Sequence, residues 1–269
     1  MSRIETVYYD LGRLDLLADK NTFIHRLDPR VKVVTTFLFI IYVISFSKYE
    51  ITRLLPFFFF PALLIGLADL PFGFLLRKIA LVSPFVLFIG IFNPLLDKEI
   101  IFHFGSLQVS GGWLSFISIL LRFTLTLGAA LILIATTGFP AICMALEKMG
   151  TPKIFTVQLL MLYRYLFVLI EESIRTIRAY TLRSFSRKKL RYEIFKQLLG
   201  NLLLRTLDRA QRIHMAMLSR AFTGEIKVAR NFSFGTSELF YLAGGTVLLT
   251  AVRFIDISAI VGKLILEAG

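Results

Sequence analysis

The chain has 269 residues, of which 56% are hydrophobic and 18% are charged, and its formal net charge is +13. A soluble domain carries about 25% charged residues, and the apolar residues here gather in long runs. The composition therefore excludes a soluble globular protein and indicates an integral membrane protein. The single cysteine, Cys143, excludes an intramolecular disulfide and a cysteine-based metal site.

Apolar runs predict the membrane-spanning helices in chain order. A spanning helix needs about 20 apolar residues, and five runs reach or approach that length: 33–47, 54–68, 79–96, 113–137 and 238–252. Ahead of the first run, Asp28 and Pro29 have the residue types of a helix N-cap and a first helical position. We expect an all-α integral membrane protein with about five transmembrane helices, the second of them kinked or started by its prolines.

A further apolar run, 154–170, is long enough to cross a membrane, but the charge distribution argues against a crossing. Residues 171–230 contain 14 lysines and arginines and 5 acids, a local net charge of +9 (14 − 5), whereas the connection 97–112 contains one lysine and two acids. Because cationic segments stay in the cytoplasm, we expect 97–112 outside and 154–170 as a buried or interfacial helix on the cytoplasmic side. The predicted regions are a segment with four transmembrane helices (1–137), a cytoplasmic helical insert (138–235) and a last transmembrane helix with its tail (236–269).

The cationic insert contains a short internal duplication. Shifted by 37 residues, EESIRTIRAYTLRSF (171–185) aligns with DRAQRIHMAMLSRAF (208–222). In each copy an acid, an arginine, an alanine and a second arginine follow one another at intervals of four, so they share one helix face. We expect the acid to pair with the first arginine and the last arginine to stay unpaired. The matched pairs are Glu171 with Asp208, Arg175 with Arg212, Ala179 with Ala216, Arg183 with Arg220 and Phe185 with Phe222.

Several interpretations of Arg183 and Arg220 follow from the residues alone. They can be solvated charges that hold the insert in the cytoplasm. They can bind phosphate or nucleic acid, although the chain has no phosphate-binding loop and no interleaved aromatic residues typical of nucleic-acid modules. A third interpretation is docking, because a planar guanidinium beside small residues can enter a partner's groove and bind carboxylates there.

Motifs in order along the chain resemble the transmembrane T component of energy-coupling factor (ECF) transporters, most closely the CbiQ-like group linked to cobalt and nickel uptake. Three of its residues, Leu182, Ser219 and Ala221, stand where that family commonly has alanine or glycine, and they leave the arginines intact. The motifs are HRLDPRVKV (25–33), LRFTLTLGAALILIATT (121–137), ALEKMGTP (145–152), MLYRYLFVLIEE (161–172), LRS (182–184) and SRA (219–221).

The resemblance implies a subunit with no catalytic site and no bound cofactor. Such a T component lies in the bacterial or archaeal cell (inner) membrane and bridges two cytoplasmic ATPase subunits, which hydrolyse ATP, to a small membrane subunit that binds the substrate. Long coupling helices would transmit the motion of the ATPases. Cobalt or nickel would be the substrate, and a T component serving a vitamin-binding subunit is the alternative. The implied ATPase-docking residues are Arg183, Ser184, Ser219, Arg220 and Ala221.

Other charged residues are expected to support the structure or the coupling motion. A charge at the bilayer centre costs roughly 2.5–3.5 kcal/mol, so Arg122 should face the bundle or a partner, or reach the interface. Arg164 should lie near the lipid headgroups. The three histidines are scattered, so no metal site is expected on this chain, and another subunit would hold a transported metal. The remaining residues of this group are Asp28, Pro29, Arg30, Glu171, Arg175, Asp208 and Arg212.

Two other classes of protein are disfavoured. An intramembrane enzyme would need paired acids, a serine–histidine set or a histidine cluster within the apolar runs. A self-sufficient channel or carrier would need polar residues along several runs, or two internally related halves. The sequence has neither pattern.

Overall fold

The computed structural model describes residues 12–47, 49–96, 100–104, 107–183, 192–224 and 235–254. The chain divides into two compact units, and each is described by itself. The bundle unit consists of Asp15–Gly138 and Asn231–Gly269, and the insert unit consists of Met1–Leu14 and Phe139–Arg230.

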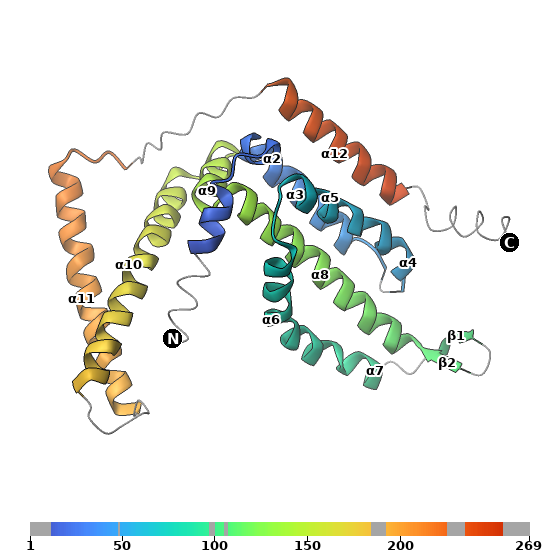
Figure 1. The fold of residues 1–269 in the computed structure, drawn as a ribbon, viewed down its shortest axis with the longest axis horizontal. Coiled ribbons are helices and arrows are strands. Elements are labelled where there is room, and N and C mark those ends of the chain that lie inside the picture. Colours follow the sequence, from blue (N-terminus) through green and yellow to red (C-terminus); the bar gives the residue numbers. More distant parts are fainter. Residues whose placement is uncertain are drawn as a thin grey trace. The chain divides into compact units, whose positions relative to one another are not determined.

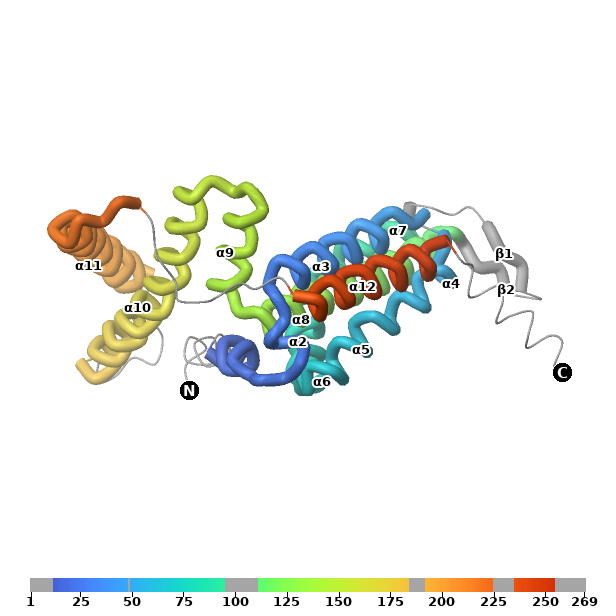
Figure 2. Tube along the Cα trace, turned by 90° about the horizontal axis from the view of Figure 1, so that it is seen from above, coloured from blue at the N-terminus to red at the C-terminus, as the bar shows by residue number. Residues whose placement is uncertain are grey.

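The helices of the bundle unit follow the predicted runs in order. Figure 1 and Figure 2 show α8 among the other helices of this unit, where it packs against α3, α6 and α7, while α12 packs along α3. The expected all-α membrane class is confirmed by these helices. Their bounds are α2 (Phe23–Arg26), α3 (Pro29–Ile44), α4 (Ile51–Leu54), η1 (Leu55–Phe58), α5 (Phe59–Leu67), α6 (Phe72–Gly90), α7 (Phe92–Leu96), α8 (Gly111–Thr137) and α12 (Thr236–Phe254).

Local sequence explains where α3 begins and how its first turn is held. Asp28 is the N-cap, its Oδ1 accepts a hydrogen bond from the Arg30 amide at 2.8 Å, and Pro29 is the first helical residue. Both assignments agree with the prediction. One turn later, Lys32 is buried and its Nζ donates to the Thr136 carbonyl at 3.0 Å. That carbonyl belongs to the last turn of α8, where backbone carbonyls lack a hydrogen-bond donor within the helix. The ammonium supplies the donor and thereby connects the start of α3 to the end of α8.

An aromatic cluster fills the space between α3 and the stretch from α4 to α5. The Phe39 ring centroid lies 5.1 Å from that of Phe60 and 5.9 Å from that of Phe57, and Phe46 meets Phe57 edge-on at 5.3 Å. All four rings are buried. Inside a bilayer such contacts are stabilised by van der Waals packing rather than by removal from water.

The second predicted run is irregular where prolines predict it to be. Pro56 stands in the first turn of η1, a 3-10 segment between two α-helical ones. Proline lacks the amide hydrogen needed to continue an α-helical ladder, which favours a short tighter turn at this point. The helical path continues through α4, η1 and α5, and it begins three residues before the predicted run.

A glycine permits a close approach of α6 to α8. A Cβ built on Gly90 would lie 2.8 Å and 3.0 Å from two ring carbons of Phe116. These separations are shorter than carbon atoms adopt without displacement. The end of α6 therefore reaches α8 only because residue 90 has no side chain.

A two-stranded hairpin is the one β-structure among the described residues. β1 (Ile100–Phe104) pairs antiparallel with β2 (Leu107–Ser110). The sequence predicted only a connection over 97–112. Apolar stretches on both sides of a Gly-Ser pair are a hairpin signal, which the charge of this connection does not reveal.

Length and hydropathy support membrane crossing for part of the predicted set. The stretches Phe72–Pro94 and Gly111–Thr137 are long and apolar enough to span a bilayer, and Ile51–Leu67 is a shorter apolar helix. α3 has 16 residues, about 24 Å at 1.5 Å per residue, against a hydrocarbon thickness of about 30 Å. Lys153–Arg183 also meets the criterion of length and hydropathy. The count of five spans and the cytoplasmic position of 154–170 therefore stay predictions.

From Phe139 onward, the described residues of the insert unit form the helices α9 (Phe139–Lys148), α10 (Lys153–Arg183) and α11 (Tyr192–Ser219). α9 is attached to α10 by the Phe139 ring, which stacks on Tyr163 with the ring centroids 4.7 Å apart. α10 and α11 lie side by side (Figure 1). They are antiparallel, because the end of α10 shares a cavity with the start of α11, and the start of α10 shares one with the end of α11.

Candidate functional site

α11 ends in a Schellman motif that contains predicted docking residues. The Phe222 amide donates to the Met217 carbonyl at 3.0 Å, and the Ala221 amide donates to the Leu218 carbonyl at 3.0 Å. These two bonds close a helix end in that motif. Ala221 has a φ of 54°, in the left-handed region that favours glycine. Arg220 is the C-cap, where a positive charge interacts favourably with the helix dipole.

The same motif gives Phe222 a structural role. The residue after the left-handed position of a Schellman motif commonly packs against the helix residue five places earlier. Phe222 and Met217 stand in that relation and line the same cavity. The sequence grouped this phenylalanine with the docking arginine, whereas the geometry assigns it to the helix end.

The corresponding end of α10 is described only as far as its arginine. Arg183 is the last residue of α10 and is exposed. Ser184 and Phe185 lie outside the described residues. Within the described part of the chain, neither Arg183 nor Arg220 takes part in an ion pair. On α11, the predicted docking residue Ser219 is the last helical residue, and its hydroxyl donates to the backbone one turn earlier.

The predicted pairing within each copy of the duplication holds in one copy. Arg175 lies 3.6 Å from Glu171, an ion pair between exposed side chains four residues apart. Asp208 and Arg212 are also described and exposed, but no ion pair joins them, so the prediction is wrong for the second copy. An exposed pair on a helix contributes only about 0.3–0.5 kcal/mol, which is too little to hold two long side chains together at every such spacing.

An ion-pair cluster that the sequence did not predict joins the two long helices. Glu172 of α10 lies 3.5 Å from Arg205 and 3.4 Å from Arg209, both on α11. The carboxylate is the most buried of the three groups, with 26% of its side chain exposed. Glu172 and Arg209 are counterparts in the 37-residue alignment, so the crossing of the helices lies at equivalent positions of the two copies.

This crossing places the two predicted docking arginines at opposite ends of the helix pair. Arg183 follows the crossing on α10 and Arg220 follows it on α11, and the two helices run in opposite directions. Arg183 lies 11 residues past Glu172, and Arg220 lies 11 residues past Arg209. Because the helices leave the crossing in opposite directions, the two stretches add to the length of 22 helical residues (11 + 11) along the pair. At 1.5 Å per residue this is about 33 Å.

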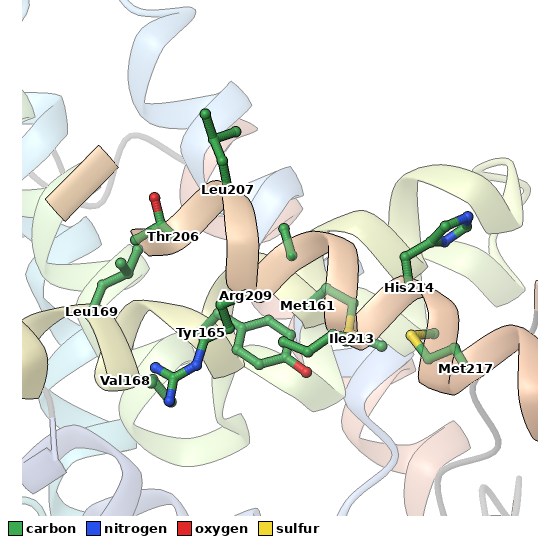
Figure 3. Close-up of a pocket in the computed structure, with 11 residues that line it drawn as sticks. Met161, Tyr165, Val168, Leu169, Thr206, Leu207, Arg209, Ile213, His214 and Met217 are labelled. Carbon is green, nitrogen blue, oxygen red and sulfur yellow. The ribbon is translucent and has the colours of Figure 1, made fainter. Parts of the chain in front are cut away.

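Two adjoining cavities lie between α10 and α11. The first, of about 440 Å³, is walled by apolar side chains of both helices together with Arg209 and His214, as Figure 3 shows. The second, of about 610 Å³, shares Met161 and Met217 with the first and contains Arg220. Among the described residues that line the two cavities, none is acidic. The surface at this end of the helix pair is therefore apolar with cationic groups.

The remaining predicted residues lie on separate elements. The Arg122 Nη2 donates to the Ser47 carbonyl at 2.6 Å, so this guanidinium faces the bundle, one of the placements expected for it. Arg164 is exposed on α10. Arg30 stays beside its cap, with Nε 3.9 Å from Asp28 Oδ1. The coupling roles of these residues remain predictions.

No metal centre forms in the described part of the chain. No group of three or more histidine, cysteine, aspartate and glutamate side chains is placed there to hold an ion. The location of a transported metal on another subunit remains a prediction.

Comparison with known proteins connects this geometry to a family. Residues 20–229 match the CbiQ family, described as cobalt transport protein. The energy-coupling factor transporter transmembrane protein EcfT of Bacillus subtilis (strain 168) is 30% identical over 219 residues, covering 76% of this chain and 82% of that protein. The EcfT protein of Ruminiclostridium cellulolyticum is 26% identical over 218 residues, covering 76% and 81%. The cobalt transport protein CbiQ of Salmonella typhimurium is 30% identical over 100 residues, 37% of this chain and 44% of that protein.

The family match runs from before α3 to beyond α11 and takes in both arginine signatures. It confirms the resemblance that the motifs indicate. The chain belongs to the CbiQ cobalt transport protein family, as a T component of the energy-coupling factor type.

Proposed function

We propose that this chain is the coupling subunit of an ECF-type importer, which transmits the ATP-driven motion of two cytoplasmic ATPase subunits to a small substrate-binding membrane subunit. The transported substrate is cobalt or nickel ion. The chain itself hydrolyses no ATP and binds no cofactor. Arg183 and Arg220 each dock one ATPase subunit, assisted by Ser184, Ser219 and Ala221.

The arrangement of α10 and α11 carries the proposal. Two arginines without ion-pair partners among the described residues stand at opposite ends of one antiparallel helix pair, about 33 Å apart along it. Two similar ATPase subunits require two separate contact points on this chain. A rigid pair of helices between these points would pass a displacement of one contact point to the other. An interface arginine beside an apolar surface is the type of residue that dominates binding energy.

The charge distribution supports the orientation. Residues 171–230 carry a net charge of +9, and cationic segments remain on the cytoplasmic side. The N-terminus and residues 138–235 are therefore cytoplasmic in this proposal, in the cell (inner) membrane of a bacterium or archaeon, and the ATPases meet the insert unit on that side.

Co-purification tests the proposal. We expect the wild-type chain, expressed together with the proposed ATPase and substrate-binding subunits of its own organism, to purify in detergent as a complex with ATPase activity. Arg183→Ala and Arg220→Ala should each weaken ATPase binding by about tenfold or more, the effect of losing at least 1.4 kcal/mol at an interface. Arg178→Ala, an exposed arginine of α10 outside the docking residues, is the matched control. A wild-type chain that purifies without any ATPase subunit contradicts the proposal.

Transport by the purified complex identifies the substrate. We expect ATP-dependent uptake of cobalt or nickel ions into proteoliposomes that contain all subunits, and none when the chain is omitted. Uptake of a vitamin but not of either metal would assign the chain to a vitamin-binding partner, which is the alternative that the sequence motifs left open.

A further inference from the structure

The larger cavity of the insert unit contains a second arginine. Arg164 of α10 and Arg220 at the end of α11 both line the cavity of about 610 Å³. Within the described residues neither guanidinium has an ion-pair partner, and no acid lines the cavity. Two like charges converge on one concave surface without a counter-charge, which makes this surface a focus of positive potential.

Aromatic contacts hold the α10 side of this cavity in place. Tyr163 stacks on Phe139 with centroids 4.7 Å apart and meets Phe167 edge-on at 5.3 Å. The Arg164 guanidinium carbon lies 5.9 Å from the Tyr165 ring centroid, within the range of a cation–π contact. The second guanidinium comes from a helix end closed by two hydrogen bonds. The two cations are thus supplied by separate, supported elements.

The rest of the wall defines the chemistry of the occupant. Apart from the two arginines, the lining is apolar or aromatic and includes Met161, Ile213 and Phe222. Paired guanidinium groups bind carboxylates through charge-assisted hydrogen bonds, which strengthen where water is excluded. An occupant that matches both features presents a carboxylate flanked by apolar side chains.

The opposite end of the helix pair differs. The cavity there has a volume of about 140 Å³, and the described residues that line it, which include Thr176, Ile177 and Phe195, contain no arginine. The 37-residue duplication predicts two equivalent ends, whereas of these two cavities only the one beside Arg220 has arginines among its described lining residues.

We propose that Arg164 and Arg220 form one binding site for an acidic, apolar-flanked segment of an ATPase subunit, and that this site makes the two ends of the helix pair unequal. The inference rests on the proposed function, because the occupant is the partner that Arg220 docks. Arg164 is a specificity-determining residue of this end, and loss of its charge affects this end alone.

Photo-crosslinking at each end tests the proposal in the assembled complex. A benzophenone amino acid replaces Leu218, close to the Arg220 end, or Leu182, beside Arg183; both side chains are exposed, and neither lines the cavity of about 610 Å³. We expect Arg164→Ala to weaken ATPase cross-linking from position 218 by about tenfold and to leave cross-linking from position 182 within twofold of wild type. The control on the same helix is Arg178→Ala, which should change neither.

A double-mutant cycle separates a shared site from two independent ones. If both guanidiniums bind one occupant, Arg164→Ala combined with Arg220→Ala should cost less than the product of the single losses. Arg164→Lys keeps the charge but not the forked donor geometry, so it should recover part of the affinity. Independent losses, or equal losses at both ends, overturn the inference.

The remaining outcomes distinguish this inference from the proposed function. If Arg220→Ala weakens cross-linking and Arg164→Ala does not, the inference fails and the proposed function stands. If the wild-type chain binds no ATPase, both the inference and the proposed function fail. If neither variant alters ATPase binding but both lose an anionic phospholipid that co-purifies with the wild type, the cavity is a lipid site and the inference is refuted.

Discussion

Replacing Ala221 by glycine should strengthen the end of α11. The residue has a φ of 54°, and an L-residue with a side chain pays roughly 1–2 kcal/mol in the left-handed region. Glycine avoids this cost but loses more backbone entropy on folding, about 0.5–1 kcal/mol. The net stabilisation is about 0.5 kcal/mol, or roughly a twofold shift in the local opening equilibrium. α9 supplies the precedent, because Gly150, with a φ of 114°, occupies the equivalent position in its own Schellman motif.

Hydrogen exchange of the intact chain in detergent measures this shift. Peptides that cover 215–224 should exchange about twofold more slowly in Ala221→Gly than in the wild type. The matched control is Ala216→Gly on the same helix, at a position with ordinary helical geometry. There glycine costs about 1 kcal/mol, so exchange should be about fivefold faster. If both substitutions shift exchange in the same direction, or if Ala221→Gly accelerates it, the left-handed cap at residue 221 is refuted.

Three further outcomes are expected. Gly90→Ala should lower the melting temperature in size-exclusion thermal assays, because overpacking costs about 1–3 kcal/mol. Adding Phe116→Leu should restore the melting temperature. An unchanged melting temperature in Gly90→Ala would contradict the close approach of α6 and α8. His25 is buried, and burial, assisted by the charge of Lys32, lowers its pKa. Its contribution to stability is therefore complete above the unfolded pKa of about 6.5 and is lost as the pH falls through the lower folded pKa. His25→Gln should flatten the pH dependence of the melting temperature below about pH 6.5. Parallel curves of melting temperature against pH for both proteins would disprove this. Glu172→Gln should weaken the contact between α10 and α11 by no more than about 1 kcal/mol, since its partners are largely exposed. High salt should weaken this contact similarly in the wild type. A loss of stability in Glu172→Gln that does not change with salt would argue against the ion pairs.

Local signals predicted the helices of this protein well. Asp28 and Pro29 cap α3 as expected, because a cap depends on residues within one turn of it. The prolines of the second run mark an irregular segment for the same reason. The hairpin of β1 and β2 was also within reach of a local rule, since apolar stretches flank a Gly-Ser pair, but the preference for helix in an apolar chain obscured it.

Contacts between distant residues could not be predicted. Arg122 was expected to face the bundle, but its acceptor, the Ser47 carbonyl, is 75 residues away and depends on how α8 packs beside α3. Glu172 and Arg209 were aligned as counterparts in a duplication, yet nothing in that alignment indicates that they touch. Their contact requires the helices to be antiparallel with this particular register.

Helix ends without glycine are a further limit of sequence patterns. α9 (Phe139–Lys148) is followed by Gly150, and a glycine just past a helix end is the usual signal of a left-handed cap. α11 ends in the same motif around Ala221, where no glycine marks the left-handed position in the sequence. The docking arginine was identified from its neighbours in the sequence, whereas its position as a C-cap emerges only from backbone geometry.

The ion pair between Glu172 and Arg209 has a mechanical consequence. Each arginine proposed to dock an ATPase lies 11 residues beyond its own member of the pair, so the two arms from the ion pair to these arginines have equal length, about 16 Å each. If the proposed coupling motion rotated the pair by ~10° about this contact, the tip of either arm would move by about 3 Å. Equal arms give equal displacements at both tips, and inserting one helical turn between Glu172 and Arg183 would lengthen one arm by about 5 Å and unbalance them.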